Sequence, residues 1–214
     1  MPQTRFVNKQ LSEGINKLGH EAVVEYNSNF FGNNFRTNVF KELANHTGLQ
    51  QPVYMMHGKE VICSRECVTM GEGFAEWTPT IEKIKDILES SFDTEYSHCG
   101  IIRYRDNEDS LGLHRDSETP NGKICVVSFG ATRELRFQEM PRVREGNLTP
   151  IRWLLKVNNG DVYQMNQEAC GPKSKWKHGV LQNKEKCEIR YVLTFRSSCN
   201  YNKLIVGEGS KKSK

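Results

Sequence analysis

The pattern of hydrophobic and polar residues divides the chain into a first part with two helices and a longer second part with the short period of β-strands. After Ser91 the apolar residues alternate with polar ones or form short runs, separated by turn dipeptides such as Asn121-Gly122 and Asn159-Gly160. The strands predicted in this way cover residues 100–104, 124–129, 134–137, 153–157, 161–165 and 189–196. Helices followed by many short strands predict an α+β domain with a jelly-roll core.

The clearest helix is predicted from Trp77 to Leu88. Thr78 is a suitable N-cap, and Pro79 takes the first helical position, where a missing N–H costs no hydrogen bond. Ile81 and Ile84 belong to one apolar stripe. We expect this helix to pack on a sheet and to take no part in chemistry.

A second helix is predicted from Val39 to Gly48, with Thr37 or Asn38 as its cap. Residues 23–26 form a further predicted strand.

The two ends of the chain differ from its middle. Residues 1–22 are polar and predict a loose lead-in with at most a short helix. Residues 201–214 are polar and basic, which predicts a disordered tail. The domain itself is therefore expected to span residues 23–200.

Residues 52–74 have no steady hydrophobic period and contain three glycines. A segment of this length without regular structure is typical of a binding loop or lid. A short hairpin that covers the core explains the composition equally well. Cys63 and Cys67 are interpreted as ordinary thiols, because no second pair of zinc ligands lies nearby.

Composition limits the function classes without selecting one. The 214 residues allow one domain, and a formal net charge of +4 is compatible with a polyanionic partner without indicating one. An odd number of cysteines, seven, and no signal-peptide pattern predict a reducing compartment, cytoplasmic or nuclear. No apolar run reaches the roughly 20 residues that a membrane helix needs. We expect a monomer.

One group of residues carries chemistry. In an extended strand His114 and Asp116 point to the same face, and His178 would complete two histidines and one carboxylate. This is the ligand set of non-haem Fe(II) oxygenases. Arg190 and Arg196 share a face of the last predicted strand, because their separation is even. A metal site with two inward guanidiniums predicts a pocket for a small dicarboxylate.

These motifs resemble the AlkB family of Fe(II)/2-oxoglutarate dioxygenases, the oxidative nucleic-acid demethylases. The resemblance covers roughly residues 52–196. The segments that carry it are Ile102–Asp106, Leu111–Glu118, Val127–Arg133, Gly160–Val162, Lys177–Val180 and Arg190–Arg196. It implies a double-stranded β-helix (jelly-roll) core with N-terminal helices, and it makes residues 52–74 the nucleotide-recognition lid.

The resemblance also implies roles for single residues. His114, Asp116 and His178 would bind Fe(II). Arg196, helped by the Tyr104 hydroxyl, would bind the distal carboxylate of the cosubstrate 2-oxoglutarate, with Arg190 near its metal-proximal end. With O2, such an enzyme releases succinate and CO2, and it removes an N-methyl group from a base such as 1-methyladenine or 3-methylcytosine as formaldehyde.

The implied partner is methylated nucleic acid, whose target base must leave its stack to enter the pocket. Expected phosphate contacts are Arg65, Arg133, Arg142, Arg144, Lys173, Lys175 and Lys177. Each of these could equally be a solvated surface charge.

Three departures from the family pattern affect the prediction. Ile102 stands where many members have an asparagine that hydrogen-bonds the cosubstrate. The lid lacks an aromatic-rich stretch, so Phe74 is the expected base-stacking residue, opposite His114. Glu118 is the expected acidic contact to the base. A short lid favours single-stranded RNA or DNA.

Two other functions remain open. The first is a 2-oxoglutarate oxygenase that acts on protein or on tRNA. The second is an inert β-sandwich that binds nucleic acid through its basic surface.

Overall fold

The computed structural model describes residues 6–56, 59–119, 122–140 and 150–197. Its helices are α1 (Asn33–Ala44), α2 (Pro79–Phe92) and the one-turn α3 (Gln167–Cys170). The basic tail predicted at 201–214 lies outside the described residues. None of the helices in the described ranges is long and apolar enough to cross a membrane.

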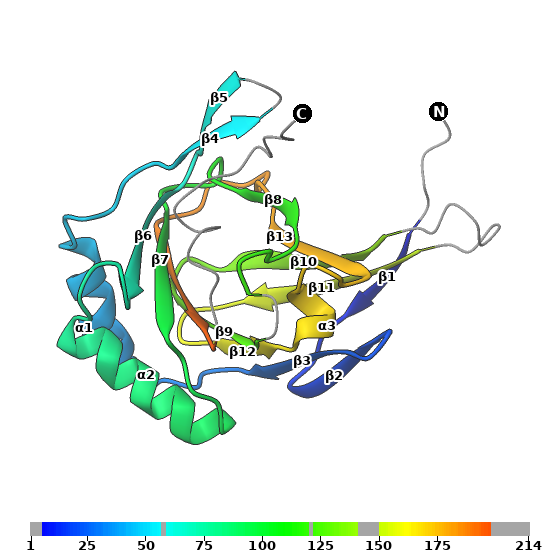
Figure 1. The fold of residues 1–214 in the computed structure, drawn as a ribbon, viewed down its shortest axis with the longest axis horizontal. Helices are drawn as coiled ribbons and strands as arrows, with labels where there is room; N and C mark the ends of the chain where they lie inside the picture. Colours follow the sequence, from blue (N-terminus) through cyan, green and yellow to red (C-terminus); the bar gives the residue numbers. More distant parts are fainter. Residues whose placement is uncertain (1–5, 57–58, 120–121, 141–149, 198–214) are drawn as a thin grey trace.

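Two sheets form the body of the molecule (Figure 1). The larger has the order β2 (Gly14–Gly19), β3 (Ala22–Asn27), β12 (Val162–Met165), β9 (Ile124–Gly130), β14 (Arg190–Arg196), β7 (His98–Tyr104), β6 (Glu66–Gly71). The smaller has the order β1 (Val7–Gln10), β11 (Ile151–Val157), β10 (Arg133–Glu139), β13 (Trp176–Val180), β8 (Leu111–His114). Many neighbouring strands in these two sheets are far apart in the sequence, and all strand pairs except β1–β11 are antiparallel. This arrangement confirms the predicted jelly-roll core.

The larger sheet is buried on both faces, which explains the mostly apolar strands in its centre. One face meets the smaller sheet in a core that includes Val126, Val192 and Phe137. The other face packs on α1 and α2 through a second core that includes Ile84 and Leu193 (Figure 1). A strand between two apolar layers can carry polar groups only where they have partners, so the polar residues of β14 and β9 mark the site.

The predicted helix at 77–88 is confirmed. The Thr78 hydroxyl accepts a hydrogen bond from the Ile81 amide, and Pro79 begins the helix. The other helix begins earlier than predicted, because Gly32 rather than Thr37 or Asn38 precedes its first turn. Its first turn contains two asparagines, whose weak helix propensity hid this start.

The prediction of a loose lead-in is wrong for residues 7–19. β1 pairs in parallel with β11 at the edge of the smaller sheet, and β2 pairs with β3 at the edge of the larger. Edge strands can be polar on both faces, and all four residues of β1 are exposed. The domain therefore begins before residue 23.

The segment expected to be a lid, residues 52–74, contains three strands. β4 (Val53–Met56) and β5 (Lys59–Ile62) form a separate hairpin that projects from the body, and β6 belongs to the larger sheet (Figure 1). The structure thus contains the hairpin, at residues 53–62, and the lid function stays a prediction. The six cysteines in the described ranges, Cys63 and Cys67 among them, form no disulfide.

Candidate metal and dicarboxylate site

Two histidines lie side by side across a strand pair. His114 ends β8 and is the register partner of His178 in β13, so both rings point between the two sheets, with centroids 4.4 Å apart. The His114 Nδ1 lies 2.9 Å from the Gly112 carbonyl oxygen. A proton on Nδ1 would satisfy this contact and leave Nε2 with a lone pair toward the site.

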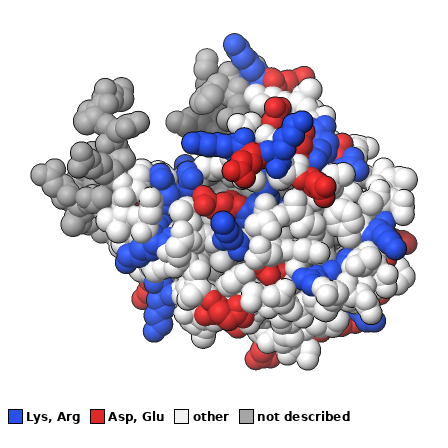
Figure 2. Space-filling model, turned by 180° about the vertical axis from the view of Figure 1, so that it is seen from behind, with Lys and Arg blue, Asp and Glu red and all other residues white. Residues whose placement is uncertain are grey.

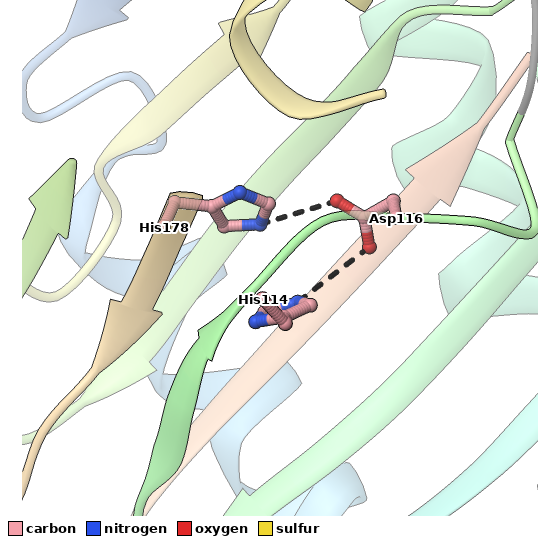
Figure 3. A group of neighbouring side chains, drawn as sticks. All are labelled: His114, Asp116 and His178. Carbon is pink, nitrogen blue, oxygen red and sulfur yellow. Dashed lines mark ion pairs between the residues drawn. The ribbon is translucent and has the colours of Figure 1, made fainter. Parts of the chain in front are cut away.

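The Asp116 side chain approaches the two histidine rings from a loop outside the strand. The sequence pattern places it in an extended strand with His114, but β8 ends at His114 and Asp116 lies in the following loop. Its amide donates to the Cys170 carbonyl at the end of α3, at 2.8 Å. This backbone contact turns the carboxylate toward the histidines (Figure 3).

The three side chains present their ligand atoms to one another. Asp116 Oδ2 lies 3.1 Å from His178 Nε2, and Asp116 Oδ1 lies 3.7 Å from His114 Nε2 (Figure 3). One ligand atom from each residue falls within 4.8 Å of the others. Oδ2 is buried, yet it forms no hydrogen bond within the described ranges. A buried carboxylate oxygen without a hydrogen bond, close to two imidazole nitrogens, fits a metal ion and is costly without one.

Charge in this cluster is balanced against burial. Burial by itself would raise the pKa of the Asp116 carboxyl, but the two neighbouring imidazoles hold that pKa well below its usual range. Burial and the neighbouring His114 lower the pKa of His178. Burial would also lower the pKa of His114, but the Asp116 carboxylate beside it raises that pKa. Asp116 therefore stays ionised, which is the state that a carboxylate needs to bind a metal ion.

The cluster opens into a cavity between the sheets. A cavity of about 50 Å³ is lined at one end by the three candidate metal ligands, then by Met165 and Tyr163, and at the other end by Tyr104 and Arg190. Ile102 lines the same wall and offers the cavity no hydrogen bond. One end is thus suited to a metal and the other to an anion.

Arg190 supplies the anion end. It is 1% exposed, and its Nε donates to the Ser128 hydroxyl at 2.8 Å. Its Nη1 and Nη2 are buried and have no hydrogen-bond partner among the described residues. Two unpartnered donors on one planar guanidinium fit the two oxygens of a carboxylate.

The expected pairing of Tyr104 with Arg196 is wrong. Tyr104 is the register partner of Arg190, whose Cζ lies 5.5 Å from its ring centroid. Arg196, at the far end of β14, lies by the metal ligands, with Nη2 3.7 Å from Asp116 Oδ1. The antiparallel register of β7 and β14 places Tyr104 opposite Arg190 and His98 opposite Arg196, so Tyr104 and Arg196 lie at different ends of the strand pair.

Glu118 belongs to the metal end of the cavity. Its Oε1 accepts a hydrogen bond from Arg196 Nη2 at 3.1 Å. The same guanidinium thus lies between Asp116 and Glu118. Its role as a contact to a base stays a prediction.

Arg133 is not a phosphate contact. It is fully buried at the start of β10, and its guanidinium donates to the carbonyls of Asp106, Asp109 and Leu181. Sequence cannot distinguish a buried arginine from an exposed one when the groups that bury it come from distant loops.

The other predicted contacts lie around the site or outside the described residues. Arg65 is half-buried, and its charge acts on Tyr104. The Phe74 ring packs edge-on to His98, with centroids 5.7 Å apart, and does not line the cavity. Lys173 and Lys175 are exposed, beside a groove near α3, and Lys177 is half-buried on β13. Arg142 and Arg144 lie outside the described ranges.

Sequence reasoning missed two residues of the site, one that supports Arg190 and one that lines the cavity. Ser128 orients Arg190, and a lone hydroxyl within the apolar run of β9 was the available signal. Tyr163 lines the cavity from β12, and no local signal distinguished it from a core tyrosine.

Comparison with known proteins places these features in a family. A model of the 2OG-Fe(II) oxygenase superfamily matches residues 20–196. Among solved structures, the chain resembles a prolyl hydroxylase from Trichoplax adhaerens in complex with a hypoxia-inducible-factor peptide, with a TM-score of 0.54 at 14% identity over 88% of this chain and 87% of that one. At this identity the likeness supports the fold alone.

Curated relatives confirm the resemblance to the AlkB family. The human DNA oxidative demethylase ALKBH2 is 30% identical over 56% of this chain and 46% of its own length. The human alpha-ketoglutarate-dependent dioxygenase alkB homolog 3 is 28% identical over 69% of this chain and 52% of its own. The uncharacterised protein R406 of Acanthamoeba polyphaga mimivirus is 29% identical over 56% and 59%. The chain thus spans about half the length of these relatives.

Proposed function

Because this chain belongs to the 2OG-Fe(II) oxygenase superfamily and is a dioxygenase of the AlkB type, we propose that it demethylates N-methylated bases in nucleic acid. Enzymes of this superfamily use Fe(II), 2-oxoglutarate and O2. Together these supply the oxidation that hydroxylates an N-methyl group, which leaves as formaldehyde while 2-oxoglutarate becomes succinate and CO2. The residues of this chain bind and orient the reactants.

The observation that carries the proposal is one cavity with two different ends. His114, Asp116 and His178 would hold the iron, and the unpartnered Nη atoms of Arg190 would bind the distal carboxylate of 2-oxoglutarate. Tyr104 lies beside that carboxylate position. Arg196, next to Asp116, would face the metal-proximal end. A dicarboxylate bound at both ends is held in a single orientation. Binding and orienting the reactants is the main contribution of the protein to cofactor-dependent chemistry of this kind.

Nucleic acid as the substrate rests on the relatives, two of which are named for DNA demethylation or as alkB homologues. Features around the cavity are compatible with it. The β4–β5 hairpin would be the nucleotide-recognition lid, Glu118 would contact the base, and Arg65 with Lys173, Lys175 and Lys177 would bind phosphates. Phe74 remains the proposed stacking residue. We infer from the short lid that the protein prefers single-stranded nucleic acid. We also propose that it is a monomer.

The test is a direct assay. The protein is incubated with Fe(II), 2-oxoglutarate and single-stranded RNA or DNA that contains 1-methyladenine or 3-methylcytosine, and formaldehyde and succinate are measured. Equal release of both, abolished by His114→Ala but not by His46→Ala, supports the proposal. His46 is a suitable control because it follows α1, accepts a hydrogen bond from the Gly48 amide and does not line the cavity. Succinate release without loss of the methyl group would instead favour a protein or tRNA substrate.

A further inference from the structure

Arg133 is a buried cation outside the ligand set. It is 1% exposed, and its charge helps to lower the pKa of the buried Asp109 carboxyl. A guanidinium cannot lose its proton in a protein, so its charge has to be offset by nearby charges and dipoles. Here three backbone carbonyls do this: Nη1 donates to Asp106 at 2.9 Å, and Nη2 donates to Asp109 and Leu181, each at 2.8 Å.

These three carbonyls lie next to the strands that form the site. Asp106 and Asp109 belong to the loop between β7, which ends with Tyr104, and β8, which ends with His114. Leu181 directly follows β13, which carries His178. One side chain thus joins the segments that flank three functional residues. β8 has only four residues and pairs with β13 through an irregular register, so it has little support of its own.

Arg133 also contacts the anion end of the cavity. Its Cζ lies 5.5 Å from the Tyr104 ring centroid, the same separation that Arg190 has from that ring. The tyrosine ring therefore contacts two buried guanidiniums. Burial lowers the pKa of Arg190, and the Arg133 charge adds to this, so the two like charges are close enough to repel each other. A bound carboxylate would relieve that repulsion.

We propose that Arg133 is a positioning residue for the cosubstrate: it fixes the Tyr104 ring against Arg190 and ties the β7–β8 loop to the end of β13. This inference rests on the proposed role of Arg190. A lysine would keep the charge, but it has no planar fork to reach three carbonyls and to stack on a ring. We therefore expect the planar geometry of the guanidinium, and not its charge alone, to determine how Arg133 affects cosubstrate binding.

The proposal is tested by binding without turnover. The protein is loaded with Mn(II), and the dissociation constants of Mn(II) and of 2-oxoglutarate are measured separately for the wild type, Arg133→Lys and Arg133→Gln. We expect both variants to bind 2-oxoglutarate about 10-fold more weakly, with a change in Mn(II) affinity below about threefold. Steady-state assays should show a raised KM for 2-oxoglutarate with kcat nearly unchanged.

Two outcomes would overturn the proposal: wild-type affinity for 2-oxoglutarate in Arg133→Lys, even if Arg133→Gln is defective, or parallel losses of metal and cosubstrate affinity. Arg190→Met separates this inference from the proposed function. If Arg190→Met still binds 2-oxoglutarate normally, the assignment of the anion site fails. If Arg190→Met loses binding while Arg133→Lys does not, only the inference fails.

The same coupling is measurable in the wild type, should both variants fail to fold. Adding 2-oxoglutarate to the Mn(II) protein should slow amide hydrogen exchange in residues 105–110, a segment that contacts Arg133 through the carbonyls of Asp106 and Asp109 and does not line the cavity. Unchanged exchange in that loop, with slower exchange in β14, would contradict the proposal.

Discussion

Tyr104 and Arg190 face each other across β7 and β14, with the Arg190 guanidinium 5.5 Å from the tyrosine ring centroid. This pair marks the end of the cavity that is suited to an anion, because the Nη atoms of Arg190 have no hydrogen-bond partner among the described residues. Six residues further along β14, Arg196 lies beside Asp116 instead. The two arginines of one strand therefore serve different ends of the site.

Replacing Arg190 should weaken cosubstrate binding. Arg190→Met removes two charge-assisted hydrogen bonds to a buried carboxylate, so we expect the KM for 2-oxoglutarate to rise about 10- to 100-fold. The KM for the oligonucleotide should change little. Arg103→Met is the matched control, because Arg103 lies on the adjacent strand and pairs with Glu66, away from the cavity. An equal effect of both substitutions would contradict the assignment.

Removing the hydroxyl of Ser128 should have a smaller effect in the same direction. Ser128→Ala leaves the Arg190 Nε without its acceptor, which costs about 1–3 kcal/mol when a donor is buried. We expect reduced thermal stability of the free protein and a several-fold higher KM for 2-oxoglutarate. Ser91→Ala, on an exposed helical position, is the control. A loss of stability without any change in KM would restrict Ser128 to a structural role.

Metal binding should stabilise the fold. One ligand atom each from the buried Asp116 carboxylate and the two imidazoles lies within 4.8 Å of the others, so a divalent ion bound there adds stability that depends on its concentration. Melting curves should shift upward with Mn(II) and return with a chelator. In His178→Ala the shift should disappear, whereas His46→Ala should keep it. A shift that persists in His178→Ala would place the metal elsewhere.

Glu118→Gln should separate substrate from cosubstrate. The substitution weakens the hydrogen bond from Arg196 without changing the size of the side chain. If Glu118 contacts the base, kcat/KM for a methylated oligonucleotide should fall about 10-fold, and the KM for 2-oxoglutarate should stay within about twofold. The reverse pattern would assign Glu118 to the orientation of Arg196.

The β4–β5 hairpin carries an exposed apolar pair suited to a lid. Val53 and Ile62 are register partners, 53% and 65% exposed. Replacing both by serine should raise the KM for an oligonucleotide about threefold or more, since exposed apolar area buried on binding contributes to affinity. The KM for 2-oxoglutarate should not change. Unaltered oligonucleotide kinetics would exclude this pair from the lid function.

Some parts of this structure could be predicted from residues that are close together in the sequence. The cap at Thr78, the proline after it and the apolar stripe of α2 depend on neighbours within one or two turns. The alternation in β14, with Tyr191, Leu193 and Phe195 toward the helices and Arg190 toward the cavity, follows from the two-residue period of a strand. Residue type and order also predicted the three candidate metal ligands, which the fold brings together.

Other parts depend on pairings between distant segments. β1 and β2 were missed because their stability comes from partners more than a hundred residues away or from an edge position, and not from their own residues. Asp116 was expected in a strand, but a carbonyl of α3 sets its direction. Arg133 looks like any surface arginine until the loops that bury it are in place.

The sequence alone thus determined which residues carry the chemistry, because ligand types and strand periodicity are local properties. Tertiary structure decided what each of them faces. Register across β7 and β14 assigned Tyr104 to Arg190, and the loop after β8 brought Asp116 to Arg196. These relationships depend on backbone pairing between strands far apart in the chain, which residue spacing along one strand does not encode.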